Sequence, residues 1–226
     1  MNYLDVLLFG VYPYVAATVF LLGSLARFER DQFTWKAHSS QILHKKNMRL
    51  ASNLFHVGII LLFLGHFFGM LTPPEILHAL GISASAKQLL AVVAGSIFGL
   101  MCFAGLTMLV RRRLTEPRIR ATSSRMDIVI LLLLYVQLIL GLLTVPLSLM
   151  HLDGHNMLNL MSWARNVVTF DPMEAVAAVG DIGFLFKLHM VLGMSIFLVF
   201  PFSRLVHIWS APVTYPARPY QIVRQR

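Results

Sequence analysis

Cysteine is almost absent from this 226-residue chain, because Cys102 is the only one. A single cysteine cannot form an intrachain disulfide. It also excludes an iron–sulfur cluster held by this chain alone, since such a cluster needs several cysteine or histidine ligands. The sequence likewise contains no glycine-rich loop of the kind that binds phosphate groups. Cys102 lies within an apolar run, where we expect a small packing residue.

Charged residues are the second shortage. Only 13% of the residues are charged, whereas 57% are hydrophobic. Five apolar runs contain about 20 residues each, which is long enough for a helix to cross about 30 Å of hydrocarbon. Little chain remains for a separate soluble domain. The sequence therefore predicts an all-α integral membrane protein with one five-helix domain over residues 1–226, and with spans at about 4–25, 50–71, 89–110, 128–149 and 183–209.

The first apolar run lacks the marks of a cleavable signal peptide. It follows the segment Met1-Asn2-Tyr3-Leu4-Asp5, which has no basic residue, and no convincing small-residue cleavage pattern comes after it. We therefore expect a permanent first span, in which Pro13 either lies in the first turns or introduces a kink.

Basic residues are concentrated between alternate spans. Sixteen of the 19 lysines and arginines lie in residues 27–49, in residues 111–125, or at and beyond the end of the last span. Cytoplasmic loops carry the excess of lysine and arginine, so the N-terminus is predicted outside and the C-terminus in the cytoplasm. The net charge of +9 follows this topology. Anionic lipid is thus the expected partner, and nucleic acid is not.

Histidine pairs in two of the spans carry the strongest functional signal. His56 and His66 lie in the second span, and His189 and His207 lie in the fifth. A titratable ring inside hydrocarbon is costly unless it is paired or coordinated, so such residues usually have a function. Two histidines on each of two helices favour two axial-ligand pairs, each binding one haem iron. A haem-free carrier that uses histidines as a proton relay is the alternative from another class.

The predicted topology also pairs these histidines. The second and fifth spans run in opposite directions, which brings His56 level with His207 near the cytoplasm and His66 level with His189 near the outside. Along ideal helices the separations are about 15 Å within the second span and about 27 Å within the fifth. We expect tilt, or a kink at Pro201, to absorb the difference, and we expect the two irons to lie on the order of 20 Å apart.

Two further features lie near the predicted outer face. Lys87 stands in the short loop before the third span, where its amine can donate a hydrogen bond to a quinol or can reach lipid headgroups as an interface anchor. Apolar residues recur with helical spacing over 157–168, which predicts a short amphipathic helix that lies on the membrane surface and covers a binding site. Near the inner face, four arginines have the depth to meet haem propionates: Arg27, Arg112, Arg113 and Arg204.

The stretches SNLFHVGIILLFLGHFFGMLTP and KLHMVLGMSIFLVFPFSRLVHIWSAPV, together with VYPYVA, FTWKAHSSQ and PRIRAT, resemble the gamma subunit of membrane-bound respiratory nitrate reductase. The resemblance covers nearly the whole chain and is weakest over residues 74–86. It implies a cytochrome b with two haems b, the inner one held by His56 and His207 and the outer one by His66 and His189. It also implies that Lys87 binds quinol.

The same resemblance implies the partners. Electrons from quinol would pass to a cytoplasmic iron–sulfur subunit and then to a molybdenum subunit that reduces nitrate, since this chain has no nitrate-reducing centre of its own. A quinol-oxidising subunit with two haems that serves a different complex, such as a sulfur-compound or heterodisulfide-type reductase, remains open from the sequence.

Overall fold

The computed structural model describes residues 2–36, 43, 46–211 and 217–219. These residues form helices and turns and no strand, and five helical segments are long and apolar enough to cross a membrane. The predicted all-α membrane architecture is therefore confirmed. Three of the basic residues counted above lie outside the described residues, namely Lys45, Arg224 and Arg226.

The spanning helices are longer than most of the apolar runs. The first covers Tyr3–Arg30 and consists of α1 (Tyr3–Asp5), η1 (Val6–Val11) and α2 (Tyr12–Arg30). The others are α3 (Met48–Leu71), α5 (Ala84–Thr115), α7 (Arg125–Met150) and α10 (Phe184–Val199). The start of α5 lies five residues before the predicted span because the Ser83 side chain accepts a hydrogen bond from the backbone N–H of Ala86 (3.1 Å) and caps the helix there.

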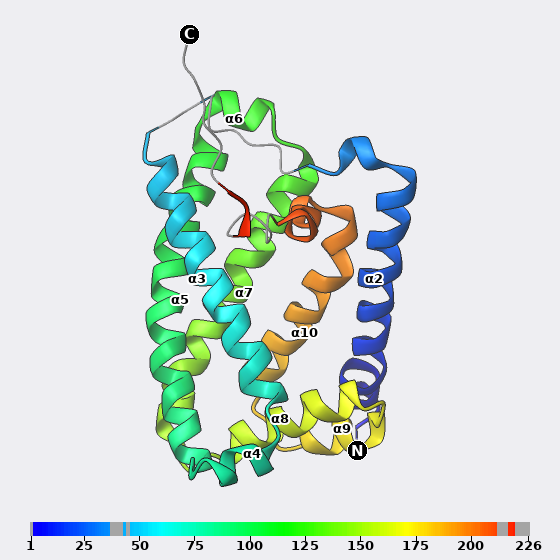
Figure 1. The fold of residues 1–226 in the computed structure, drawn as a ribbon, viewed down its shortest axis with the longest axis vertical. Helices are drawn as coiled ribbons and strands as arrows, with labels where there is room; N and C mark the ends of the chain where they lie inside the picture. The colour runs from blue at the N-terminus through cyan, green and yellow to red at the C-terminus, as the bar shows by residue number, and fades with distance from the viewer. Residues whose placement is uncertain (1, 37–42, 44–45, 212–216, 220–226) are drawn as a thin grey trace.

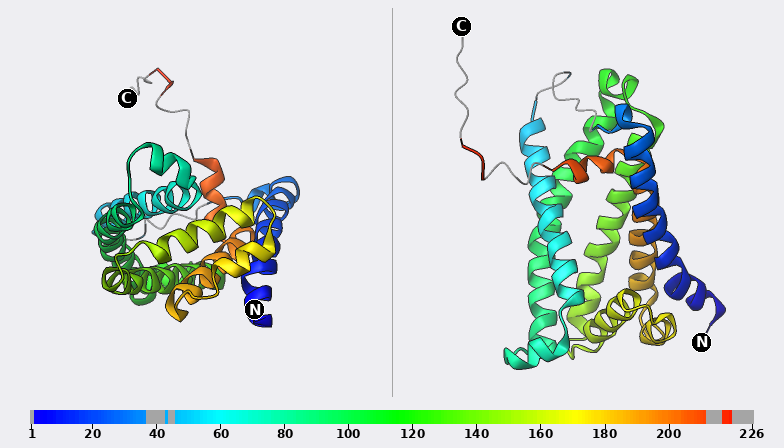
Figure 2. Two further views of the ribbon diagram at one scale, coloured as in Figure 1. Left: turned by 90° about the horizontal axis from the view of Figure 1, so that it is seen from below. Right: turned by 45° about the vertical axis from the view of Figure 1, so that its right-hand side comes forward.

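The five spans pack side by side in the order α3, α5, α7, α10 and α2, and each contacts the next (Figures 1 and 2). The first span of the chain thus packs along the last. Small residues allow a close approach of α3 to α5, since a Cβ added to Gly58 would lie 2.7 Å from Cys102 Cβ. Gly58 therefore serves this close helix contact, in which Cys102 is fully buried.

Short elements cover both ends of the bundle (Figure 1). One end, which we call the α8 end, carries α4 (Pro74–Ala79), α8 (His155–Val168) and α9 (Pro172–Ala178). The opposite end, the α6 end, carries η2 (Gln32–Thr34), α6 (Pro117–Ala121) and η4 (Arg204–Ser210). The amphipathic helix predicted over 157–168 is confirmed as α8, and its inward face buries Met161, Trp163 and Ala164.

Pro13 shapes the first span because it lacks a backbone N–H. The carbonyl of Phe9, four residues earlier, is deprived of its usual helical donor. The preceding turn, η1, is a π-helix, a form that occurs mostly as single interrupting turns. The indole N–H of Trp163 donates to the Phe9 carbonyl instead (3.1 Å). Pro13 thus lies in the first turn of α2, directly after a π-helical turn, and the freed Phe9 carbonyl ties α8 to the first span.

The last span ends earlier than we predicted. α10 stops at Val199, and 3-10 turns follow as η3 (Phe200–Phe202) and η4. η4 lies crosswise to the long helices at the α6 end (Figure 2, right). Because Pro201 removes a helical donor, the chain leaves the α-helix here. A continuous helix over 183–209, with about 27 Å between its histidines, is thus wrong. α10 continues for only about 15 Å beyond His189. This length equals the axial rise from His56 to His66 along α3.

Candidate functional site

The rings of His66 and His189 face each other between α3 and α10. Their centroids are 6.2 Å apart, and the ring planes are inclined by 42°. On α3, the Nδ1 of His66 lies 2.8 Å from the carbonyl oxygen of Leu62, one helical turn earlier. This backbone contact leaves the Nε2 of His66 as the nitrogen that is available to another partner. The structure therefore brings together the two residues that we predicted as the outer pair.

His189 is largely buried against α7. A Cβ added to Gly141 would lie 3.0 Å from His189 Cε1, so a side chain at this position would push the ring aside by a few tenths of an ångström. The amide of Gln137 donates to the His189 carbonyl (3.1 Å), and its nitrogen lies 3.4 Å from His189 Nε2. Among the described residues, His189 Nδ1 and Gln137 Oε1 are buried without a hydrogen-bond partner. This polar group inside the bundle suits a further ligand.

The sequence analysis missed Gln137 and Gly141. Both stand in the run ILLLLYVQLILGLLTV of the fourth span, where Gln137 is the only amide. An amide at membrane depth is itself a signal, because it needs a partner that hydrocarbon cannot provide. Their relation to His189 depends on the packing of α7 against α10, which a single sequence does not reveal.

His56 and His207 both lie toward the α6 end. His56 is on α3, and its Nδ1 is 2.7 Å from the Ser52 carbonyl oxygen. His207 is on η4, and its Nδ1 is 2.6 Å from the Arg204 carbonyl oxygen. Each ring therefore keeps Nε2 for another partner, as His66 does. No contact between these two rings is found within the described residues, so this predicted pair is brought to one end of the bundle but not into contact.

Lys87 lies inside the first turns of α5 and not in the loop where we had placed it. Its side chain is 7% exposed. The ammonium donates to the thioether sulfur of Met161 in α8 (3.2 Å), its only hydrogen-bond partner within the described part of the chain. This burial contradicts the alternative of an interface anchor that reaches lipid headgroups. α8 therefore covers a buried cation whose one partner is a weak acceptor.

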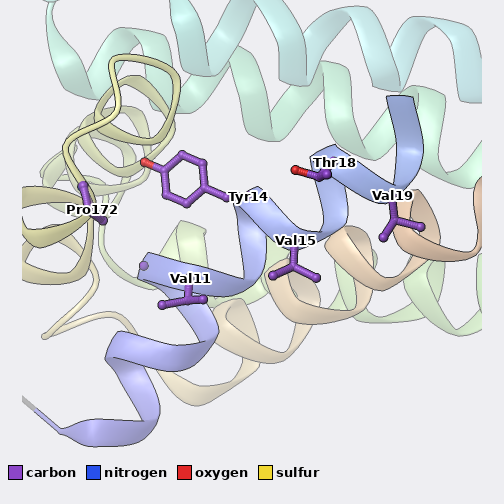
Figure 3. A pocket seen from close by; sticks show the side chains of 7 residues that line it. Val11, Tyr14, Val15, Thr18, Val19 and Pro172 are labelled. Atoms are coloured by element: carbon purple, nitrogen blue, oxygen red, sulfur yellow. The ribbon is translucent and has the colours of Figure 1, made fainter. Parts of the chain in front are cut away.

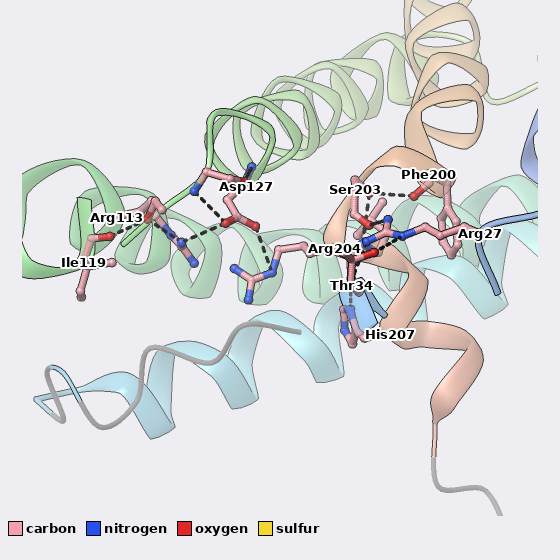
Figure 4. Close-up of polar contacts among 12 residues, drawn as sticks. Arg27, Thr34, Arg113, Ile119, Asp127, Phe200, Ser203, Arg204 and His207 are labelled. Carbon is pink, nitrogen blue, oxygen red and sulfur yellow. Dashed lines mark hydrogen bonds and ion pairs between the residues drawn. The ribbon is translucent and has the colours of Figure 1, made fainter. Parts of the chain in front are cut away.

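Arginines that we predicted near the inner face contact protein groups at the α6 end, as Figure 4 shows for Arg27, Arg113 and Arg204. Arg27 donates to the carbonyl oxygens of Pro201 (2.6 Å) and Ser203 (2.8 Å). Arg113 and Arg204 flank the buried carboxylate of Asp127 at 4.0 Å and 3.7 Å. Burial lowers the pKa of Arg204; the Asp127 carboxylate opposes this effect and Arg113 adds to it. A role toward propionates stays a prediction for each of them.

A separate hollow of about 450 Å³ lies between α2 and the start of α9 (Figure 3). Its lining is almost wholly aliphatic, and Tyr14, which stacks on Phe170 with ring centroids 5.7 Å apart, is its only ionisable side chain. None of the predicted site residues lines it. The candidate functional site is therefore the region around α3, α10 and η4 that carries the histidines, and not this hollow.

Comparison with known proteins assigns the chain to a protein family. The family model of the nitrate reductase gamma subunit matches residues 5–226. The chain belongs to the nitrate reductase gamma subunit family. It is 51% identical over 226 residues to the respiratory nitrate reductase 1 gamma chain of Escherichia coli (strain K12), with 100% of both chains covered. Identity is 50% to the respiratory nitrate reductase 2 gamma chain of the same organism, over 100% of this chain and 99% of that one.

A more distant relative supports the same assignment. The chain is 36% identical over 220 residues to the nitrate reductase gamma chain of Bacillus subtilis (strain 168), with 97% of this chain and 98% of that one covered. The resemblance stated from the sequence is thus confirmed. As a member of this family, the chain is a multi-pass membrane subunit of nitrate reductase, an oxidoreductase with further subunits. The family also decides against the sulfur-compound and heterodisulfide-type complexes.

The residues of this family member fit a haem better than a bare metal ion. Among the described residues, no three histidine, cysteine, aspartate or glutamate side chains converge as a metal site would require. A haem iron needs only two axial ligands from the protein, because the macrocycle supplies the others. The facing rings of His66 and His189, beside the unpartnered Nδ1 of His189, fit that requirement.

Proposed function

We propose that this chain is the cytochrome b subunit of respiratory nitrate reductase and carries two haems b. In this function it oxidises quinol near the outer face and passes the electrons to a cytoplasmic iron–sulfur subunit, which supplies a molybdenum subunit that reduces nitrate. The observation that carries the proposal is the 6.2 Å between the ring centroids of His66 and His189. An imidazole nitrogen lies about 2 Å from a metal that it binds, so two rings on opposite sides of one iron have centroids roughly 6 Å apart.

The backbone contacts of the histidine rings support the same assignment. A ligating imidazole usually donates its second N–H to a carbonyl or carboxylate, which fixes the tautomer and the ring orientation. His56, His66 and His207 each have Nδ1 within 2.6–2.8 Å of a backbone carbonyl oxygen. We therefore assign His66 and His189 to the outer haem and His56 and His207 to the inner one. A haem held in this way supplies one-electron transfer at its iron.

Lys87 is the candidate for quinol binding. An ammonium group has three protons to donate, and a thioether is a weak acceptor. The buried Lys87 amine, with only Met161 Sδ as a described partner, is therefore incompletely satisfied. A quinol oxygen that enters beneath α8 would give it a stronger acceptor. The quinol would be bound at the α8 end, where its two protons can leave to the outside.

The direction of electron transfer rests on the predicted orientation. The α6 end carries Arg111, Arg118, Arg120 and Arg125 around α6, and the positive-inside rule assigns such an end to the cytoplasm. The α8 end would then face outward, with the N-terminus outside and the C-terminus inside. Electrons would move inward while protons stay outside, so each quinol would separate charge across the bacterial inner membrane.

The test is a reduced-minus-oxidised absorption spectrum of the purified complex, followed by spectra of four single variants. We expect two b-type haems in the unmodified protein. His66→Ala and His189→Ala should each remove the outer haem, and His56→Ala and His207→Ala should each remove the inner one. A spectrum without haem bands would instead favour the haem-free proton relay. If His56→Ala and His189→Ala removed the same haem, the assigned pairing would be wrong.

A further inference from the structure

The position of His207 depends on contacts with other elements, because no α-helix carries it. η4 is a 3-10 turn that begins after Ser203, and 3-10 turns have poorer hydrogen-bond geometry than α-helices. The ends of the segment are held by neighbours from distant parts of the chain. Arg27 donates to the carbonyls of Pro201 and Ser203, and the indole N–H of Trp35 donates to Ser210 Oγ (2.7 Å).

Between these two attachments, one residue connects His207 to the start of α7. The carbonyl oxygen of Arg204 lies 2.6 Å from His207 Nδ1. The guanidinium of the same Arg204 pairs with the carboxylate of Asp127, with Nε 3.7 Å from Oδ1 (Figure 4). The backbone that orients the ring and the side chain that meets Asp127 therefore belong to one residue.

Asp127 is itself firmly placed and nearly inaccessible, with 6% of its surface exposed. It forms a capping box with Ser124: the Ser124 N–H donates to Asp127 Oδ2 (3.1 Å), and the Asp127 N–H donates to Ser124 Oγ (3.0 Å). Its second neighbour is Arg113 from the end of α5, at 4.0 Å. One carboxylate thus separates two guanidinium groups, which would otherwise face each other in a half-buried position.

We propose that Asp127 is a positioning residue that, through its ion pair with Arg204, holds the ring of His207 in the orientation needed to ligate the inner haem. This inference rests on the proposed assignment of His207. A neutral side chain at position 127 would remove the negative charge between Arg113 and Arg204 and so increase the repulsion between them. Arg204 would move, and the carbonyl that accepts the His207 N–H would move with it.

The experiment compares variants in membranes that contain the complete nitrate reductase. Asp127→Asn keeps the size of the side chain and an oxygen for the cap, but removes the charge. We expect the ferric electron paramagnetic resonance signal of the inner haem to shift or disappear, since this signal reports how the axial imidazoles are oriented. The signal of the outer haem should stay unchanged. Its retention would also show that the bundle has assembled.

Two further variants make the outcome decisive. Ser124→Ala removes the serine half of the capping box but leaves the charge of Asp127, so both haem signals should match those of the unmodified protein. Arg204→Gln breaks the ion pair from its other side and should reproduce the selective effect on the inner haem. Asp127→Asn could abolish both haems by preventing assembly, and Arg204→Gln would then decide. An unchanged inner-haem signal in Arg204→Gln would overturn the inference, and a change in the inner-haem signal alone would support it.

His207→Ala separates the two levels of the proposal. Two haems in that variant would overturn the ligand assignment and this inference together. Loss of the inner haem in His207→Ala, combined with unchanged signals in Asp127→Asn, would overturn the positioning role of Asp127 alone. An effect of Ser124→Ala equal to that of Asp127→Asn would likewise reduce Asp127 to a helix cap.

Discussion

Gly141 gives the sharpest test of the proposed outer site, because the structure fixes the size of the perturbation. In Gly141→Ala the new Cβ would lie 3.0 Å from His189 Cε1. Non-bonded carbon atoms prefer about 3.5–4.0 Å, so the ring has to move by a few tenths of an ångström. A functional constellation has to be held within about 0.5 Å of its productive geometry, and a shift of this size uses much of that tolerance. The variant should therefore weaken the outer haem site and leave the inner site intact.

The expected magnitude follows from the energy of overpacking. Inserting a methyl group into a well-packed interior costs about 1–3 kcal/mol. With about 1.4 kcal/mol for each factor of ten, the affinity for the outer haem should fall roughly 5- to 150-fold. The assay is the haem content of membranes under limiting haem supply, read from reduced-minus-oxidised spectra together with the midpoint potential of each haem.

A matched control separates this effect from the general consequences of replacing a helical glycine by alanine. Gly95 lies on α5, and a Cβ added there meets nothing within 4 Å. Gly95→Ala shares the gain in helix propensity of about 1 kcal/mol and should keep both haems. Full occupancy and an unchanged potential of the outer haem in Gly141→Ala would refute the placement of its ligand beside α7.

Three other perturbations have defined outcomes. Lys87→Ala should keep both haems but slow their reduction by quinol about 10- to 100-fold, because a charge-assisted hydrogen bond contributes about 1.5–3 kcal/mol. Stopped-flow absorbance measures this rate, and an unaltered rate would mean that quinol binds elsewhere. Trp163→Phe keeps an aromatic ring but leaves the Phe9 carbonyl without its donor, so the free energy of unfolding should fall by about 1–3 kcal/mol, as denaturant titration would reveal. An unchanged value would mean that this bond does not stabilise the attachment of α8 to the first span. Pro201→Ala should let α10 continue and carry His207 away, with loss of the inner haem alone; a retained inner haem would show that another residue sets the turn.

The spans and the approach of His66 to His189 were predictable because each leaves a local mark in the sequence. An apolar run of sufficient length has one stable form in a bilayer, and His66 and His189 are conspicuous at membrane depth. The amphipathic helix α8 was predictable for a similar reason, since its apolar stripe has helical periodicity. These features depend on the order of residues within one segment.

The remaining features depend on segments that meet only in the folded chain. The burial of Lys87 arises because α8 folds back over the start of α5, and the place of Gly141 beside His189 arises from the packing of α7 on α10. The end of α10 was misjudged for a different reason. The apolar residues continue past Pro201, so hydropathy gives no sign of the turn. Contacts of Arg27, Trp35 and Arg204 with the segment hold the chain in its new direction.

The neighbour relations of the first span constrain how the chain can be assembled during synthesis. α2 ends at Arg30, whereas its long partner α10 begins at Phe184, about 150 residues later. At about 5–20 residues per second, the ribosome needs roughly 8–30 s to make that partner. Throughout this interval the first span has to persist in the bilayer without the helix it will finally pack against. The predominantly apolar sequence of α2 suits that wait, and the bundle closes only when the fifth span enters.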